Sequence, residues 1–461
     1  MNFLNFTLMI AEHTLDKSFP AGSRKWRDKL FICAVAVFFF LLPLQTRYIF
    51  RAPTDGGVPY EYGTLSLFLV EVLGWVVISL GIWKIKIITF RAAARNVIKS
   101  FLPLCLLTAL SYLSILWAPD KAVALQAAVR LLEGVVLLVV LAASRDQATT
   151  KSGLVTSVAW AFLVGATLQA ILGIYQFLTQ SSFSSSFLGM ALHDPRALGT
   201  AVVEFADQRW LRAYGGLPHP NILGGYLAIA TAVVIAFLHK LPVRQNLQRL
   251  LLSSTIFVLI TGIFFSFSRS AWVAGIVLLG YWVIKLFRDR TQWQMAGYWL
   301  LLIGYLVFLV FLFRPLVAAR VLPVQESRLE VKSRVERVEG AREAWQLARA
   351  HPVLGVGIGN YTQAVAREVR LGEPLYTYQP AHNVFLLVWA ELGIMGLVLF
   401  MVILYWILKQ SNFLILNSSF LILLTFDHYL WSLPFGILLF WGILGLFTYN
   451  PQDRLDPVVK V

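Results

Sequence analysis

The sequence predicts an all-α polytopic membrane protein with about twelve transmembrane helices. Of its 461 residues, 58% are hydrophobic and 14% are charged, whereas a soluble domain has about 25% charged residues. The mean hydropathy is +0.71. Apolar runs of about 20 residues, the length that crosses the hydrocarbon core of a bilayer, recur along almost the whole chain.

The net charge of +15 reflects membrane topology rather than a nucleic-acid partner. The basic residues fall in short connections between apolar runs, as the positive-inside rule requires of cytoplasmic loops. Cys33 and Cys105 both lie inside apolar runs, which indicates packing residues rather than a disulfide framework or a thiolate metal site. No basic region precedes the apolar residues of MNFLNFTLMIAEH, so we expect insertion by uncleaved helices.

The apolar runs divide the chain into membrane and extramembrane parts. We expect residues 1–29 to be cytoplasmic and 30–313 to hold the first nine transmembrane helices. The last three should lie within 384–448, before a cytoplasmic tail at 449–461. The connection Lys84–Lys99 carries five basic residues and no acid, which places it in the cytoplasm. The predicted spans begin near residues 30, 64, 101, 121, 153, 219, 250, 270, 297, 383, 412 and 432.

Two predicted external connections are long, at 179–218 and 314–383. Within the second, Arg328–Ala350 has the 3, 4 and 7 spacing of an amphipathic helix, which we expect to lie over the membrane. The segment HPVLGVGIGNY follows and lacks the ending of a phosphate-binding P-loop, so we interpret its glycines as a tight turn that permits close packing. The predicted apolar face of the helix comprises Val331, Val335, Val338, Ala341, Trp345 and Ala348.

The most informative stretch is Tyr378–Gly396, in which a polar segment runs directly into an apolar one. His382 and Asn383 therefore lie at a predicted membrane boundary, and Glu391 is the only charged side chain in the apolar segment that follows. An imidazole exchanges a proton near neutral pH, so His382 is a candidate catalytic residue for chemistry on lipid-borne substrates. A histidine that merely anchors the chain at the interface is the alternative on this stretch alone.

The loop 179–218 ends in RWLRAYGGLPHPNILGGYL, in which Arg212 precedes His219 by seven residues. Arg212 is a better functional candidate than Arg196 or Arg209, because it is closer to the predicted membrane surface. His219, followed by Pro and Asn, also has the pattern of a helix start, which is an alternative to direct catalysis by this residue.

A further arginine interrupts two apolar runs in GIFFSFSRSAWVAGIV, which together are long enough to cross the bilayer twice. By the parity of the spans this turn is external, so Arg269 lies on the same side as Arg212. An arginine in a tight hairpin can simply snorkel to the interface, and this interpretation competes with a role in binding an anion.

These stretches resemble the O-antigen ligase and polymerase family, the membrane glycosyltransferases of bacterial surface polysaccharides. The resemblance runs from about Arg212 to Gly436 and is carried by RAYGGLPHPNILGGYL, FSFSRSAW, HPVLGVGIGNY and AHNVFLLVWAELGIMG. It implies a GT-C-like fold and an active site of Arg212, Arg269 and His382, with His219 in support. It also implies a bacterial inner-membrane protein whose active site faces the periplasm.

The residues fit the transfer of a glycan from a polyprenyl (undecaprenyl) diphosphate to an acceptor hydroxyl. Guanidinium groups offer planar, permanently charged donors to phosphate oxygens, which suits Arg212 and Arg269 to the leaving diphosphate. The acceptor hydroxyl has to lose a proton, which suits His382 as general base. We count His219 and Asn383 with the substrate-binding residues. The partners would be the bilayer, the lipid-linked donor and a glycan or glycolipid acceptor.

The sequence shows no carboxylate pair at the outer face and no carboxylate cluster suited to Mg²⁺. We therefore expect a reaction without metal or cofactor, in a single displacement with inversion. Asp427 and His428, in the last external turn, add a carboxylate and an imidazole whose role the sequence leaves open.

Two alternatives remain at this point. Family members with these motifs include both ligases and polymerases, so the acceptor is open. A flippase or transporter would carry ionic residues along a pathway, for which Glu71, Arg130, Glu133 and Glu391 are the candidates. Arg130 and Glu133, however, lie three residues apart on one helical face and can pair with each other.

Overall fold

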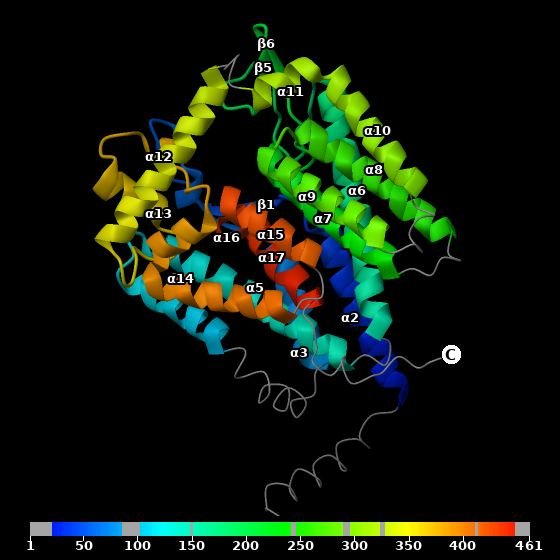
Figure 1. Ribbon diagram of the computed structural model, residues 1–461. Coiled ribbons are helices and arrows are strands. Elements are labelled where there is room, and N and C mark those ends of the chain that lie inside the picture. The colour runs from blue at the N-terminus through cyan, green and yellow to red at the C-terminus, as the bar shows by residue number, and fades with distance from the viewer. Residues whose placement is uncertain are drawn as a thin grey trace, which may run out of the picture.

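The computed structural model describes residues 21–84, 102–147, 151–240, 246–288, 296–322, 328–410 and 414–447. Most of these residues are helical, and the helices pack around a continuous apolar core (Figure 1), so the predicted all-α class is confirmed. A helix lies at or near each predicted span. These helices are α2 (Ala21–Leu41), α3 (Leu69–Lys84), Leu102–Leu116, α5 (Lys121–Gln147), α6 (Lys151–Thr179), α7 (Pro220–Lys240), α8 (Asn246–Ser266), α9 (Arg269–Arg288), α10 (Ala296–Leu312), α14 (Val384–Gln410), α15 (Leu414–Phe426) and α17 (Pro434–Phe447).

The number of membrane crossings is not settled by these helices. Within the described ranges, five helices are long and apolar enough to cross a bilayer, or six if α10 and the short helix after it, bent by 84°, form one broken span. The helix Leu102–Leu116, α15 and α17 are apolar but shorter than the length that spans the hydrocarbon core. The prediction of about twelve spans therefore stays a prediction.

Several predicted boundaries shift. The first helix begins at Ala21 rather than near residue 30, so part of the segment predicted to be a cytoplasmic terminus is helical. The second predicted span begins as an extended strand, and its helix starts only at Leu69. The predicted cytoplasmic loop after Lys84 and the tail 449–461 lie outside the described residues.

Short antiparallel strands in the loops are the main departure from the predicted all-helical chain. Strand β1 (Arg47–Arg51) pairs with β4 (Leu65–Phe68), and the small ribbon of β2 (Thr54–Asp55) and β3 (Val58–Pro59) lies between them in the sequence. The long loop before α7 forms a hairpin of β5 (Val202–Phe205) and β6 (Gln208–Leu211). The connection between the first two helices is thus a folded element and not the simple link that we expected.

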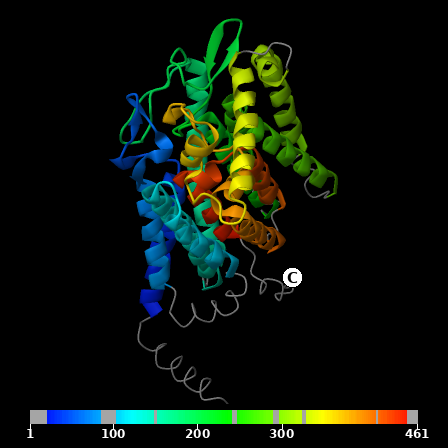
Figure 2. The ribbon, with the colours of Figure 1, turned by 90° about the vertical axis from the view of Figure 1, so that its left-hand side faces the viewer.

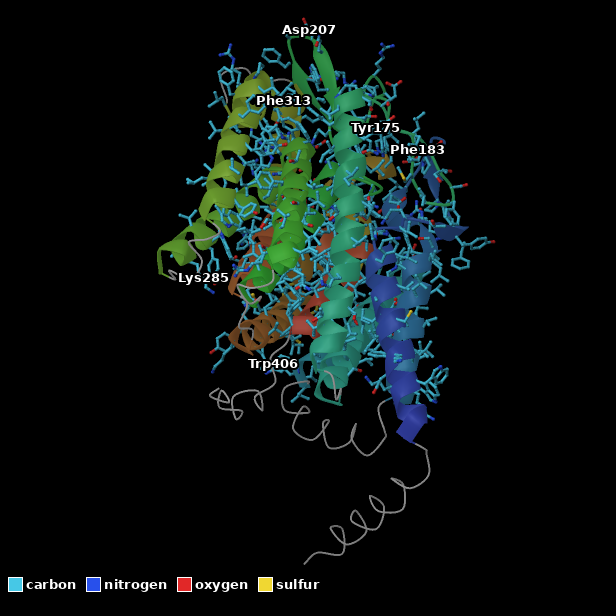
Figure 3. All side chains as sticks on the ribbon, turned by 90° about the vertical axis from the view of Figure 1, so that its right-hand side faces the viewer. Tyr175, Phe183, Asp207, Lys285, Phe313 and Trp406 are labelled. Atoms are coloured by element: carbon cyan, nitrogen blue, oxygen red, sulfur yellow. The ribbon has the colours of Figure 1, made fainter. Side chains whose placement is uncertain are left out.

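The extramembrane segments between consecutive helices pack together at one end of the bundle. Asp120, just before α5, accepts a hydrogen bond from Arg51 at 2.6 Å, and the backbone N–H of Asp120 donates to Asn360 Oδ1 at 2.7 Å. Figure 2 shows the strands of the first loop in blue and the hairpin in green toward the same end. Figure 3 shows Asp207 at the hairpin tip, with Lys285 and Trp406 toward the opposite end.

The predicted amphipathic helix has the predicted bounds, Arg328–Ala350, and is α12. The predicted apolar face is only partly buried, since Val331, Val335, Val338 and Trp345 are 38–51% exposed. In the C-terminal half of α12, which packs against α14, Ala344, Leu347 and Ala348 are buried, and Trp345 meets Trp389 of α14 edge-to-face at 5.2 Å. Ala348 and Trp345 belong to the predicted face, whereas Ala344 and Leu347 do not. The shorter helical elements are α11 (Arg314–Val321), α13 (Tyr361–Ala364), α16 (Tyr429–Ser432), η1 (Glu61–Gly63), η2 (Ser114–Leu116), η5 (Val365–Val369) and η6 (Leu375–Thr377).

The glycine-rich segment packs into a break in α14. At Gly393 the backbone leaves the helical conformation (φ 66°, ψ −172°), which frees the carbonyls of the preceding turn. The backbone N–H of Val356 donates to Ala390 at 2.9 Å, and that of Gly357 donates to the Glu391 carbonyl at 2.8 Å. A Cβ on Gly355 would come within 2.4 Å of the Glu391 backbone, so the prediction that these glycines permit close packing is confirmed.

Candidate active site

His382 lies at the end of the bundle where the extramembrane segments meet, just before α14. Its Nδ1 is 3.6 Å from Oδ1 of Asp427, which follows α15, and its ring centroid is 5.1 Å from that of His428. The 3.6 Å separation is that of an ion pair and is too long for a hydrogen bond. His382 Nδ1 and Asp427 Oδ2 are buried atoms with no hydrogen-bond partner among the described residues. The turn between α15 and α16 therefore places the carboxylate of Asp427 beside His382, the predicted base.

The surroundings of this turn act strongly on its titratable groups. Burial raises the pKa of Asp427, but His382 and then His428 outweigh it and hold that pKa well below its usual range. Burial and the nearby His382 lower the pKa of His428 to about 4. At neutral pH the turn therefore holds an ionised carboxylate beside a neutral imidazole.

Asn383 caps α14. Its Oδ1 accepts the backbone N–H of Leu386 at 3.0 Å, and its Nδ2 donates to the carbonyl of Thr425, near the end of α15, at 3.1 Å. Both ends of this amide thus tie α14 to α15 and fix the position of His382. Its predicted contact with substrate stays a prediction.

Arg212 is buried and lies against the start of α7 and the end of α8. Its Nε donates to the Ser266 carbonyl at 2.8 Å, and its Nη2 donates to Asn221 Oδ1 at 2.7 Å. His219 Nδ1 accepts the backbone N–H of Asn221 at 3.1 Å, so His219 also starts α7, as the predicted alternative required. Hydrogen bonds thus join Arg212, His219 and Asn221 into one corner at the start of α7.

This corner lies near His382 and near Asp427 in the turn between α15 and α16. Burial, followed by the charge of Arg212, lowers the pKa of His219 to about 3, while Asp427 opposes this effect and His382 adds to it. The charges of Arg212, Asp427 and His382 can act on one ring only because all three groups lie near it. Arg212 and His219 therefore lie near the catalytic candidate His382, although both are far from it in the chain.

Arg269 is the first residue of α9, immediately after the turn from α8. Its Nε and Nη2 are buried atoms without a hydrogen-bond partner in the described part of the chain, and Nη2 lies 3.6 Å from Oε2 of Glu330. Buried guanidinium donors without partners are costly, so a site of this kind is suited to an anionic ligand.

Two further arginines belong to this site and were missed by the sequence prediction. Arg320 on α11 donates from Nε to the Phe267 carbonyl at 2.9 Å and forms a close ion pair with Glu330. Arg337 on α12 is half-buried, and the charges of Asp427, Arg269 and Glu330 all act on it. A signal was present, because Glu330 and Arg337 are seven residues apart and so share one face of a predicted helix.

We call Arg212, Arg269, Arg320 and Arg337 the arginine cluster. Burial and then the charge of Arg320 lower the pKa of Arg212 well below its usual range, with Arg337 adding to this effect and Glu330 opposing it. The mutual repulsion shows that positive charge in the cluster exceeds what its carboxylates compensate. Beside Arg337, α12 also carries an open groove of about 490 Å³, lined by Arg337, Val338, Ala341, Arg342, Trp345 and Gln346.

His382, Asp427 and His428 offer three metal-ligand atoms within 4.8 Å of one another. Two imidazoles and one carboxylate would suit zinc better than magnesium. The neighbouring arginine cluster opposes a cation, however. The Nδ1 of His428 is hydrogen-bonded to Ser432 Oγ at 2.6 Å, which leaves Nε2 as its only free ligand atom. The nearby positive charge makes this set a poor cation site.

Three of the four ionic residues weighed for a transport pathway make structural contacts, whereas Glu133 Oε1 is buried with no hydrogen-bond partner among the described residues. Arg130 Nε donates to Glu71 Oε1 at 2.8 Å, so Arg130 pairs across to α3 and not with Glu133 as the sequence suggested. Glu391 accepts a hydrogen bond from Trp431 Nε1 at 2.8 Å beside the glycine-rich segment. These contacts hold helices and loops together, which removes most of the basis for a pathway.

Apolar helices that surround a buried, histidine-bearing site rich in arginine are typical of a multi-pass membrane protein. Residues 254–401 match the family model described as O-antigen ligase. The matched segment includes Arg269, Arg320, Arg337 and His382, whereas Arg212 and Asp427 lie outside it. The resemblance seen in the sequence is confirmed over this segment. No curated protein matches the chain.

Proposed function

We propose that this protein is an O-antigen ligase-type transferase. It moves a glycan from undecaprenyl diphosphate to an acceptor hydroxyl at the periplasmic face of the bacterial inner membrane. The observation that carries the proposal is the 3.6 Å approach of His382 to the carboxylate of Asp427, close to His219 and Arg212. The family match supports the class of reaction.

The arginine cluster would bind the diphosphate of the donor. Arg269 has two buried donor atoms without partners, and phosphate oxygens are the acceptors that guanidinium groups bind most strongly. Arg320 and Arg337 add charge from the other side of Glu330. As the glycosyl bond breaks, negative charge grows on the leaving diphosphate, and fixed cations stabilise that charge at no cost in reorganisation.

His382 would act as the general base. The acceptor oxygen forms a bond to the anomeric carbon while the bond from that carbon to the phosphate oxygen breaks, and its electron pair leaves with the diphosphate. The hydroxyl proton passes to the imidazole of His382, which Asp427 then stabilises as an imidazolium. A single displacement of this kind inverts the anomeric configuration. His219 and Asn383 would position the substrate and the base, and no metal is required by this scheme.

Transfer by purified protein in nanodiscs tests the proposal. The donor would be an undecaprenyl-diphosphate-linked oligosaccharide, and the acceptor would be lipid A–core. A glycolipid product whose new linkage has the inverted anomeric configuration by NMR is the expected result. Donor transported across a vesicle membrane without any new glycosidic bond would instead establish a flippase and overturn the proposal.

A polymerase of the same family is the second candidate, because the matched family and the site residues do not separate the two activities. The same reaction mixture distinguishes them. A ligase extends lipid A–core by one donor glycan, whereas a polymerase joins donor glycans to each other and gives a ladder of lipid-linked products when no lipid A–core is present.

A further inference from the structure

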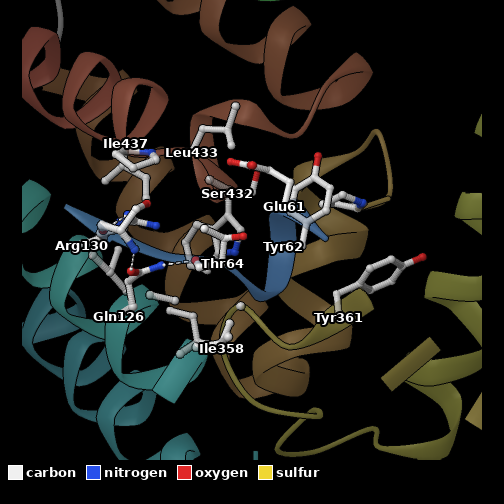
Figure 4. Close-up of a pocket in the computed structure, with 18 of the residues that line it drawn as sticks. Glu61, Tyr62, Thr64, Gln126, Arg130, Ile358, Tyr361, Ser432, Leu433 and Ile437 are labelled. Carbon is white, nitrogen blue, oxygen red and sulfur yellow. Dashed lines mark hydrogen bonds between the residues drawn. The ribbon is translucent and has the colours of Figure 1, made fainter. Parts of the chain in front are cut away.

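A pocket of about 90 Å³ lies between the first extramembrane loop, α5, the glycine-rich segment and the turn from α16 to α17. Figure 4 shows Tyr62, Thr64, Gln126, Arg130 and Ser432 among its lining residues. At about 15 Å³ of such space for each water, the pocket has room for roughly six waters, which is close to the size of one sugar ring.

The pocket adjoins the turn that holds His428. Ser432, which lines it, bonds through Oγ to His428 Nδ1 at 2.6 Å, and the ring of Tyr62 lies 6.2 Å from that of His428. Pro380 also lines the pocket and precedes His382 by two residues. The lining is thus connected both to His428 and to the segment that holds His382.

The charge in this pocket is balanced, in contrast to the arginine cluster. The guanidinium of Arg130 is paired with Glu71 and also donates to the Ser66 carbonyl at 2.8 Å. Arg47 pairs with Glu61 through both oxygens of the carboxylate. A phosphate would find no excess positive charge here, whereas neutral hydroxyl groups would find donors and acceptors fixed in place.

The rest of the lining combines aromatic rings with fixed polar groups. The rings are those of Tyr62, Tyr361 and Trp431, and Tyr361 is held by its hydroxyl, which donates to the Gly340 carbonyl at 2.9 Å. Gln126 is oriented by the backbone N–H of Ser66 at 2.8 Å. Flat apolar faces beside oriented amides and guanidiniums are what a sugar ring, with its apolar faces and equatorial hydroxyls, can bind.

We propose that this pocket binds the terminal sugar of the acceptor and presents one of its hydroxyls to His382. This inference rests on the proposed function. An inverting displacement requires the acceptor oxygen to approach the anomeric carbon from the face opposite the diphosphate. None of the four arginines of the cluster lines the pocket, so the acceptor and the diphosphate would be held in different places. No diphosphate would enter it, because its ionic groups are already paired.

Cysteine labelling at Leu433 tests the proposal within one folded protein. Leu433 lines the pocket and is half-buried. Leu433→Cys would be made in a Cys33→Ala, Cys105→Ala background and labelled with a bulky methanethiosulfonate. The matched control is Leu421→Cys on α15, since Leu421 is 38% exposed and does not line the pocket. Two probes would be compared for protection: the core oligosaccharide from rough lipopolysaccharide, and the free oligosaccharide of the donor.

We expect one of the two oligosaccharides to slow the labelling of Leu433→Cys and not that of Leu421→Cys. Protection by the core oligosaccharide identifies a ligase acceptor, and protection by the donor oligosaccharide identifies a polymerase acceptor. After labelling, the KM for the acceptor should rise at least about tenfold in Leu433→Cys, while the donor Kd stays unchanged. The reason is that a blocked pocket loses contacts that bind the acceptor equally in the ground state and in the transition state. The labelled control should keep the KM of the unlabelled protein.

The outcomes separate this inference from the proposed function. Labelled Leu433→Cys that transfers glycan with an unchanged acceptor KM would overturn the acceptor pocket and leave the transferase activity intact. Protection by an oligosaccharide in a protein that forms no glycosidic bond would overturn the transferase proposal while supporting a glycan site. Equal labelling with and without both oligosaccharides would reject the pocket as a glycan site.

Discussion

Oδ1 of Asp427 lies 3.6 Å from Nδ1 of His382, although a complete helix pair, α14 and α15, separates the two residues in the chain. The same Oδ1 accepts the backbone N–H of His428 at 3.0 Å. The carboxylate is thereby fixed by its own turn and directed at the base. Separations between catalytic groups often shorten only when substrate binds, so the distance suits a residue that positions and stabilises the base.

Asp427→Asn tests this relationship. The amide is nearly isosteric and its oxygen can still accept the His428 N–H, but the negative charge is lost. We expect kcat to fall by about 10- to 100-fold, the equivalent of one charge-assisted hydrogen bond, with the KM for both substrates nearly unchanged. Asp194→Asn, in an exposed loop, is the control.

His382→Ala should abolish transfer while the protein still inserts, folds and binds its donor. The loss of a general base lowers the rate by about 10²- to 10⁴-fold, whereas donor affinity comes from the arginine cluster and the lipid. Turnover and donor Kd, measured on the same purified sample, separate the two effects. His351→Ala is the control, since that histidine pairs with Glu368 away from the site. A His382→Ala protein as active as the wild type would remove the base from the mechanism.

Arg269→Lys should lose most activity and weaken donor binding. Lysine keeps the charge but not the planar pair of donors, Nε and Nη2, that Arg269 leaves without partners. We expect roughly a 10- to 100-fold loss in kcat/KM for the donor, the cost of one to two charge-assisted bonds. Arg196→Lys, on the exposed loop before the hairpin, should be neutral. Unchanged kinetics in Arg269→Lys would reduce Arg269 to an interfacial anchor.

Protonation of His428 should lower thermal stability as the pH drops from about 6.5 to about 4. The pKa of His428 is lowered in the folded protein, so the unfolded chain binds the proton first and stability rises with pH across that window. The contribution of this residue is on the order of 3 kcal/mol. His428→Asn should flatten the slope. Melting temperatures measured across this range check the prediction, and equal slopes in the two proteins would contradict it.

Topology tags test the sidedness on which the mechanism depends. A tag inserted at Gly372, an exposed position with open space around its α-carbon, should report the periplasm. Tags within Lys84–Lys99 and at the C-terminus should report the cytoplasm. A cytoplasmic report from Gly372 would place the site on the wrong side for a lipid-linked glycan exported to the periplasm.

The sequence predicts the helices and part of the site because both depend on local patterns. Apolar runs gave nearly every helix position, and α12 has the predicted ends because its charge and spacing are regular over six turns. His382, Arg212 and His219 were found because each stands at a polar-to-apolar boundary, and such boundaries meet at one end of a bundle.

The rest of the site depends on contacts that no local pattern carries. Arg320 and Arg337 are ordinary basic residues of a polar loop until α11 and α12 bring them to Glu330. The burial of Ala344 and Leu347 was missed because docking on α14 decides which residues of α12 are buried, and periodicity alone does not reveal the docking partner. Likewise, Arg130 pairs with Glu71 because β4 and α3 lie against α5.

The break in α14 links the assembly of the membrane part to the folding of the large loop. Ala390 and Glu391 have carbonyls whose hydrogen-bond partners lie in the loop, and the N–H of Ile394 donates to Pro352 at 2.9 Å. Without the loop these groups would be unpaired inside an apolar bundle, where each costs several kcal/mol. The final shape of α14, which follows His382 and Asn383, therefore depends on the docking of the preceding loop.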